Sequence, residues 1–295
     1  MSLQITPLNE SRADFAGQVK GLDVRQPLTE EDRIAIEKAM DTFGVLVFPN
    51  QVITDEQQYA FSENFGTMER ATGDITAQSE RRLSMDINDI SNLNKDGQVL
   101  DRHDRTRLFG LGNMLWHSDS SFKETPARYS LLSARVIPDN GGNTEFADMR
   151  AAWDELDPEL KQECHDLVCE HSQIYSRGKL GFTDFTDEER QKWQPVLQRL
   201  IRRHPSTQRL SIYLSSHIGT IVDWPVPEAR LFINDLQEHA TQAKFVYVHQ
   251  WRQWDLVMWD NRVLMHRARR YDHRKHRDLH RTTVADNAPT MQQPL

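Results

Sequence analysis

The sequence predicts a mainly β protein of the α+β class, a β-sandwich or jelly roll with helical insertions. Short apolar segments with strand periodicity occur in the middle and at the end of the chain, and amphipathic helical segments lie between them. The Gly-rich strand-to-helix turn of a doubly wound parallel sheet is absent from the sequence. Since no repeat, linker or change in composition divides the chain, residues 1–295 are expected to form a single domain.

The N-terminal third predicts two helices, one strand and one long loop. Residues 30–43 have helical apolar spacing, and the apolar run 45–48 predicts a short buried strand. A capping box predicts a helix over about 54–65. Residues 66–113 are polar and irregular. Loops of this length in compact domains are often functional, so we expect this segment to include an active-site lid.

The rest of the chain alternates strands and helices. The turn signal Pro138–Gly142 lies between the predicted strands 129–136 and 143–148 and indicates a hairpin. Residues 149–171 are predicted to be helical, with a restart at Asp157. Further strands are predicted at 210–214, 245–251, 256–259 and 281–284, and further helices at 227–240 and from Thr186 onward.

Composition and charge argue against several functions. The 295 residues include 36 Lys+Arg and 44 Asp+Glu, a net charge of −8, which argues against a nucleic-acid-binding protein. No run is apolar enough to span a bilayer, and the N-terminus lacks the features of a secretory signal. Two cysteines fit a reducing compartment. We therefore expect a cytoplasmic protein without nucleic-acid or membrane partners.

The basic residues are concentrated near the C-terminus. Residues 262–281 contain eight Lys and Arg against two acids, a local charge of +6, so the remainder carries −14. Such a basic segment would attract small acids despite the overall negative charge.

Two groups of residues suggest metal binding. On a strand, His117 and Asp119 would point to the same side and could bind one metal ion, with His266 as a third ligand if the fold brings it close. Cys164 and Cys169, with nearby histidines, suggest zinc, but cysteines five apart on a helix point about 140° apart and lack the usual spacing. We interpret both cysteines as helix side chains.

Three segments together resemble the iron/2-oxoglutarate dioxygenases of the taurine and 2,4-dichlorophenoxyacetate (2,4-D) dioxygenase family. They are Asn113–Phe122, Gly141–Phe146 and Asp255–Arg262, and the likeness extends over nearly the whole chain, from Gly44 to Val284. It is closest to the 2,4-D herbicide dioxygenases and their α-type relatives. The resemblance implies a double-stranded β-helix with helical insertions that uses Fe(II), 2-oxoglutarate and O2.

The resemblance also implies roles for individual residues. His117, Asp119 and His266 match the iron ligands. Two imidazoles and one carboxylate leave coordination positions open for 2-oxoglutarate and O2. Thr144 and Arg277 match the residues that bind 2-oxoglutarate, and their hydroxyl and guanidinium suit a carboxylate.

The substrate site matches the family less well. Arg281 matches the arginine that binds the substrate anion, and Asn113, Ser121 and His217 match pocket positions. The departures are Asp74 and Gln98, where the 2,4-D enzymes have lysines, and Thr220, where they have a histidine. The loss of two cations and the gain of an anion predict weaker binding of an acidic substrate.

The implied reaction converts 2-oxoglutarate to succinate and CO2 and hydroxylates a small anionic substrate. An aryloxyacetate such as 2,4-D would give a phenol and glyoxylate. One alternative is the same chemistry on a sulfonate or an alkyl sulfate ester, and another is a non-catalytic jelly-roll protein that binds a metal or an organic acid. A homo-oligomer is expected.

Overall fold

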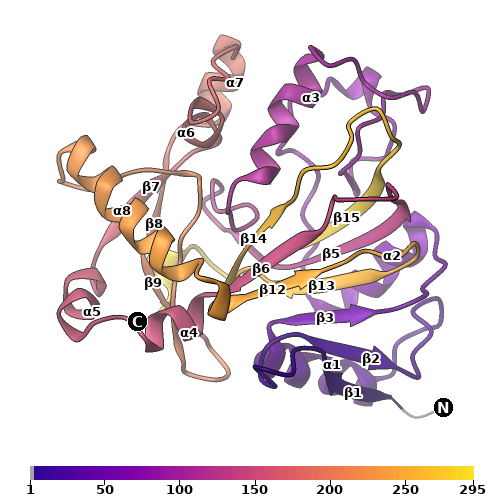
Figure 1. Ribbon diagram of the computed structural model, residues 1–295, viewed down its shortest axis with the longest axis horizontal. Coiled ribbons are helices and arrows are strands. Elements are labelled where there is room, and N and C mark those ends of the chain that lie inside the picture. Colours follow the sequence, from indigo (N-terminus) through magenta and orange to yellow (C-terminus); the bar gives the residue numbers. More distant parts are fainter. Residues whose placement is uncertain (1–2) are drawn as a thin grey trace.

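A large antiparallel sheet faces a smaller one in the computed structural model, which describes residues 3–295 (Figure 1). The large sheet contains seven strands in the order β1 (Gln4–Pro7), β2 (Gly17–Lys20), β3 (Val45–Phe48), β13 (Leu256–Asp260), β5 (Ala127–Val136), β15 (Asp278–Ala285) and β4 (Asn88–Asp89). The facing sheet contains β12 (Val246–His249), β6 (Thr144–Asp148) and β14 (Leu264–Ala268). Only the β2–β3 pair in these sheets is parallel, as expected for a jelly roll.

Two smaller sheets and most helices flank this core. The additional strands are β11 (Ile218–Ile221), β7 (Val168–His171) and β8 (Val196–Arg199), and the ribbon of β9 (Ile201–Arg203) and β10 (Leu210–Ile212). The helices are α1 (Glu30–Phe43), α2 (Asp55–Ser62), α3 (Arg105–Gly110), α4 (Met149–Asp154), α5 (Pro158–Cys164), α6 (Gln173–Gly178), α7 (Asp187–Lys192) and α8 (Val226–Ala240). Short 3-10 turns occupy Glu63–Phe65, Gln78–Glu80, Leu111–Met114, Ala243–Phe245 and Thr290–Gln292.

The central strand β13 shows how the core is divided. Its neighbours β3 and β5 pair with it on either side, so its backbone groups are satisfied within the sheet. Leu256 and Met258 face the core under α1 and α2, whereas Val257 and Trp259 face the core between the two sheets. Phe146 of β6 packs against Trp259, with ring centroids 5.6 Å apart. A strand buried on both faces explains the continuous apolar run in the sequence.

The two helices and the strand predicted over residues 30–65 are confirmed. Helix α1 spans the predicted residues, is capped by Thr29 and ends at Gly44, whose φ of 65° suits glycine. Helix α2 begins with the predicted capping box at Thr54 and Gln57, and a 3-10 turn continues it to Phe65. The fold class, a mainly β jelly roll with helical insertions, is also confirmed.

The hairpin predicted around Pro138–Gly142 is wrong. Strand β5 pairs with β13 and β15, whereas β6 pairs with β12 and β14, so the turn carries the chain from one sheet to the facing one. Gly141 is required there because a Cβ atom would lie 2.4 Å from the carbonyl oxygen of Arg270. The turn signal was therefore correct, but pairing between distant segments determined the partners of each strand.

The continuous helix predicted over 149–171 is also wrong in its last part. The chain forms α4 and α5 and then the strand β7, in which Cys169 and His171 face the interior in alternation with half-buried neighbours. Cys164 and Cys169 are free, buried thiols, and Cys169 lies on a strand rather than a helix. Period-two burial in a four-residue segment is too short a signal to recognise beside two helices.

Residues 66–113 cross the edge of the large sheet. The segment contains β4, α3 and short turns, and β4 pairs with β15 so that Asn88 lies opposite Arg281. Within residues 3–295, no helix is long and apolar enough to cross a membrane.

An ionic network ties this segment to the sheet. His280 on β15 contacts Asp55 through Nδ1 at 2.5 Å and Asp278 through Nε2 at 3.1 Å, and Arg82 and Arg135 approach the same acids. Burial opposes protonation of His280, but both carboxylates favour it, and together they raise its pKa.

We expect His280→Gln to destabilise the protein in a pH-dependent manner. A histidine whose pKa is raised on folding contributes fully below its ordinary value of 6.5, and the contribution is lost as pH rises through the higher folded pKa. The variant should therefore lose about 1 to 2 kcal/mol of unfolding free energy at pH 6 and less at pH 9. Urea unfolding at both pH values measures this, with the exposed His103→Gln as control. A loss that is equal at both pH values would contradict the charged pairing.

Candidate active site

The backbones of His117 and His266 pair with each other. The N–H of His117 donates to the carbonyl of His266 at 3.0 Å, and the N–H of His266 donates back at 2.8 Å. His266 lies in the middle of β14, and His117 forms a single bridge outside the named strands. The two ring centroids are consequently 4.2 Å apart.

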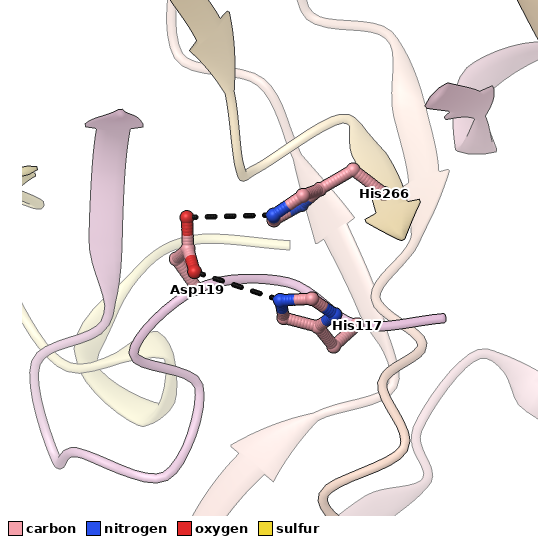
Figure 2. A group of neighbouring side chains, drawn as sticks. All are labelled: His117, Asp119 and His266. Carbon is pink, nitrogen blue, oxygen red and sulfur yellow. Dashed lines mark ion pairs between the residues drawn. The ribbon is translucent and has the colours of Figure 1, made fainter. Parts of the chain in front are cut away.

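Asp119 completes the group from a tight turn rather than a strand. Its backbone N–H donates to Asn261 Oδ1 at 3.0 Å, and the next residue, Ser120, has a φ of 54°. The turn directs the carboxylate toward both rings, with its oxygens 3.7 Å from Nε2 of His117 and 3.7 Å from Nε2 of His266 (Figure 2). The predicted juxtaposition is present, although by a different local structure.

Hydrogen bonds orient the Asp119 carboxylate. The Ser130 hydroxyl donates to Oδ2 at 2.7 Å, and the Arg281 guanidinium donates to Oδ1. Burial disfavours the charged form of Asp119, but Arg281, the two imidazoles and Ser130 outweigh it and hold its pKa at about 2. The side chain is therefore ionised at neutral pH.

The two histidines are neutral at the same pH. Burial lowers the pKa of His117 and lowers that of His266 well below its usual range. Nδ1 of His117 lies 2.7 Å from the carbonyl oxygen of Leu115, a contact that fits an Nδ1–H tautomer with the lone pair of Nε2 facing the group. Neutral imidazoles and an ionised carboxylate are the forms that bind metals.

The group fits a metal ion. Its donor atoms lie within 4.8 Å of one another, and it is the one group of three or more His, Cys, Asp or Glu side chains within residues 3–295 that could hold such an ion. Two imidazoles and one carboxylate on one face are the donor set of non-haem Fe(II) sites with open positions.

Arg277 is a buried cation without a carboxylate partner among the described residues. It is 5% exposed, and its guanidinium donates only weakly, at 3.4 Å, to the carbonyls of Ile90 and Gly142. Burial lowers its pKa, and the Tyr271 ring lies 5.4 Å away. A buried guanidinium in this state is suited to an anionic ligand.

Thr144 begins β6 two residues after Gly142, which contacts Arg277. The indole N–H of Trp251 donates to the Thr144 hydroxyl oxygen at 3.0 Å. Because that bond uses an acceptor site of the hydroxyl, the proton of Thr144 remains available for donation to an anion. Sequence reasoning missed Trp251, since nothing in its neighbourhood indicates a contact across the strands.

A cavity of about 1510 Å³ opens onto part of this site, although His266 and Thr144 are not among the residues that line it. His117, Asp119, Arg277 and Arg281 line it, and the segment 66–113 supplies much of the wall. Apolar side chains from this segment and its surroundings also line it: Leu83, Ile90, Phe109, Leu111, Met114 and Phe122. The cavity thus combines cations near the His–Asp–His group with an apolar wall.

Of the three remaining residues predicted to bind substrate, two line the cavity and one does not. Asn113 and His217 line the cavity, and the ring of His217 packs edge-on against Phe122 at 5.0 Å. Ser121 is fully buried and is not among the lining residues; its hydroxyl contacts His171 Nδ1 at 3.1 Å. A substrate role for Ser121 stays a prediction.

The three residues that differ from the 2,4-D enzymes lie at different places relative to the cavity. Asp74 lines the cavity but pairs with Arg81 at 2.8 Å, so its negative charge is compensated. Gln98 and Thr220 are not among the residues that line it. Of the changes predicted to weaken anion binding, the added anion is therefore neutralised by a neighbour that sequence reasoning did not consider.

Comparison with known proteins agrees with this geometry. Residues 4–283 match the family described as Taurine catabolism dioxygenase TauD, TfdA family. The chain is 42% identical over 288 residues to an alpha-ketoglutarate-dependent 2,4-dichlorophenoxyacetate dioxygenase of Cupriavidus pinatubonensis, covering 98% of this chain and 99% of the relative. It is 33% identical over 299 residues to an (S)-phenoxypropionate/alpha-ketoglutarate-dioxygenase of Delftia acidovorans, covering 98% and 97%.

A solved structure is also similar. The crystal structure of AAD-2 in complex with Mn(II) and N-oxalylglycine superposes with a TM-score of 0.95 at 58% identity, covering 98% of this chain and all of that one (100%).

Ser130→Ala should weaken metal binding. The change removes the hydroxyl that orients Asp119, and loss of such a supporting bond typically costs roughly 10- to 100-fold in metal affinity. Titration with Mn(II), followed by electron paramagnetic resonance, measures the change. Ser133→Ala is the matched control, because Ser133 is equally buried on the same strand but donates to Gln58. Equal affinities in the two variants would contradict the role of Ser130.

Proposed function

The chain belongs to the taurine catabolism dioxygenase TauD/TfdA family and is an Fe(II)- and 2-oxoglutarate-dependent dioxygenase, and we propose that it hydroxylates a small aryloxyacetate-like acid. The observation that carries this proposal is a cavity lined by His117 and Asp119 of the His117–Asp119–His266 group and by Arg277, a buried guanidinium without a carboxylate partner in the described part of the chain. Because the chain is an enzyme of this family, the non-catalytic alternative is excluded.

His117, Asp119 and His266 would hold the iron. When bound, the iron supplies the O2 chemistry that couples decarboxylation of 2-oxoglutarate, to succinate and CO2, with hydroxylation of a C–H bond. The protein contributes ligands in fixed positions. The backbone pairing of the two histidines fixes the position of both rings, and hydrogen bonds with Ser130 and Asn261 fix the position of Asp119.

Arg277 and Thr144 would bind the distal carboxylate of 2-oxoglutarate. Arg277 supplies two parallel N–H donors and the charge that a carboxylate needs, and Thr144 supplies one hydroxyl proton directed by Trp251. Since Arg277 is buried, the pair would bind a carboxylate away from bulk water, where charge-assisted hydrogen bonds are stronger.

The substrate would lie between Arg281 and the apolar wall of the cavity. Arg281 would bind the carboxylate, while Phe109, Phe122 and Leu83 offer a surface for an aromatic ring. Similarity to a 2,4-dichlorophenoxyacetate dioxygenase supports an aryloxyacetate. Hydroxylation of the carbon next to the ether oxygen would give a hemiacetal, which collapses to a phenol and glyoxylate.

Residues 66–113 are proposed to act as a lid within a single domain of residues 1–295. Their position in the cavity wall and their pairing with β15 support this role, because a closed cavity excludes water from the reaction. A cytoplasmic location is proposed on the two free cysteines, which fit a reducing compartment. A homo-oligomer is proposed on resemblance alone, and light scattering tests it.

We expect purified protein with Fe(II) and 2-oxoglutarate to release succinate when 2,4-dichlorophenoxyacetate is added, together with glyoxylate and the phenol. The assay should include other aryloxy acids, taurine and an alkyl sulfate as competing candidates. His117→Ala should abolish succinate release and also the visible absorption band of the anaerobic Fe(II)–2-oxoglutarate complex. Turnover of the sulfonate or sulfate ester alone would refute the carboxylic acid as substrate.

Substitutions of the two arginines should separate cosubstrate from substrate binding. Arg277→Met is expected to raise the KM for 2-oxoglutarate roughly 30- to 100-fold, because a charge-assisted pair is lost. Arg281→Ala should raise the KM for the acid about tenfold or more and have less effect on 2-oxoglutarate. Arg269→Ala serves as control, because Arg269 belongs to the same basic segment but pairs with Glu145 and does not line the cavity. The reverse pattern would show that the two roles are exchanged.

A further inference from the structure

Arg177 on α6 is a second buried cation in the wall of the same cavity. It is 6% exposed and lines the cavity, although it comes from outside the segments that suggested the site in the sequence. None of the ion pairs among residues 3–295 includes it. Its Nη1 donates to the Ser176 hydroxyl at 3.0 Å, and its Nε has no hydrogen-bond partner in the described part of the chain.

The position of this guanidinium is built by its neighbours. The ring of Phe109 lies 4.3 Å from its central carbon, a distance typical of a cation–π contact. A Cβ atom on Gly112 would lie 2.5 Å from the same carbon, so residue 112 must lack a side chain for Arg177 to occupy this place. Gly112 directly precedes Asn113, which lines the cavity. The position of the Arg177 guanidinium is therefore fixed jointly by α6, which carries it, and by the segment 66–113, which packs against it.

Arg177 shares the cavity wall with His117, His217 and Arg281. The rings of His117 and His217 have centroids 6.1 Å apart, so this wall includes the end of the cavity at the His–Asp–His group. Burial lowers the pKa of Arg177 to about 9, which leaves it protonated at neutral pH.

The other arginines at the site differ in their partners. Arg281 is paired with Asp119 and Arg81 with Asp74, whereas Arg277 would bind 2-oxoglutarate. Arg177, like Arg277, is a buried cation in the cavity wall that has no carboxylate partner in the described chain. An unpaired buried charge is costly, and an anionic ligand would offset that cost.

We propose that Arg177 binds the carboxylate of the organic substrate together with Arg281. This inference rests on the proposed function and adds a second cation to its substrate site. Arg177 would also supply the cavity with a positive charge that residue 74, an aspartate paired with Arg81, does not supply. The Phe109 ring beside the guanidinium would place the aromatic part of the substrate next to its carboxylate.

The test measures binding without turnover, with Mn(II) and N-oxalylglycine in place of Fe(II) and 2-oxoglutarate. Isothermal titration gives the Kd of 2,4-dichlorophenoxyacetate and of its neutral amide for the wild type, Arg177→Met, Arg177→Lys and Gly112→Ala. Arg230→Met is the matched control, because Arg230 is an exposed arginine on α8 that does not line the cavity. If the acid does not bind the wild type, the tightest-binding anion from the substrate panel replaces it.

We expect Arg177→Met to raise the Kd of the acid roughly 10- to 100-fold and that of the amide less than threefold. Arg177→Lys should recover part of the lost affinity for the acid. Gly112→Ala should raise the Kd of the acid, because the added methyl group would displace the guanidinium. The Kd of N-oxalylglycine should stay unchanged. Equal losses for acid and amide would show a structural role and overturn the proposal, as would an unchanged Kd for the acid or a panel in which no anion binds the wild type.

The two proposals can fail separately. Binding of 2,4-dichlorophenoxyacetate that is independent of Arg177, with normal succinate release, would refute the role of Arg177 and leave the function intact. Binding of another acid that depends on Arg177, without any reaction of 2,4-dichlorophenoxyacetate, would refute the substrate and support the residue.

Discussion

The reciprocal backbone pairing of His117 and His266 is the interaction on which the site depends. Two hydrogen bonds join a segment from the first half of the chain to the middle of β14 and set both imidazoles side by side. Asp119 follows in a turn that Asn261 holds from the end of β13. Because these contacts are made by backbone and by buried side chains of the two sheets, the three donor groups are placed before any ligand arrives, and little conformational entropy remains to be lost on binding.

The site also keeps an uneven balance of charge. Asp119 is compensated by Arg281, and Asp74 by Arg81, but Arg277 and Arg177 are buried without acids in the described chain. A protein tolerates such buried cations where the rest of the fold offsets their unfavourable free energy and where an anionic ligand can pair with them. This local positive charge would let a chain with a net charge of −8 bind the two organic anions of the proposed reaction.

Sequence reasoning succeeded where a local pattern determines the local structure. The apolar spacing of residues 30–43, the capping box at Thr54 and the apolar run of β13 each depend on residues adjacent in the sequence. The three segments that contain His117, Asp119 and His266 or flank them were specific in combination. It failed where distant segments decide: which strands flank the turn at Pro138–Gly142, that Cys169 lies on a strand, that Arg81 neutralises Asp74, and that Arg177 reaches the cavity. These depend on contacts between segments far apart in the chain, which no periodicity encodes.

The His–Asp–His group and the cavity walls belong to different parts of the architecture. His266 and Thr144 lie in paired strands, whereas Phe109, Asn113 and Arg177 come from short helices and turns at the rim. Substitutions in these wall segments would therefore change the cavity without disturbing the strand pairing that places His266. Such a division makes the fold evolvable: replacements outside the sheets can change the shape and charge of the cavity while the His–Asp–His group is inherited unchanged.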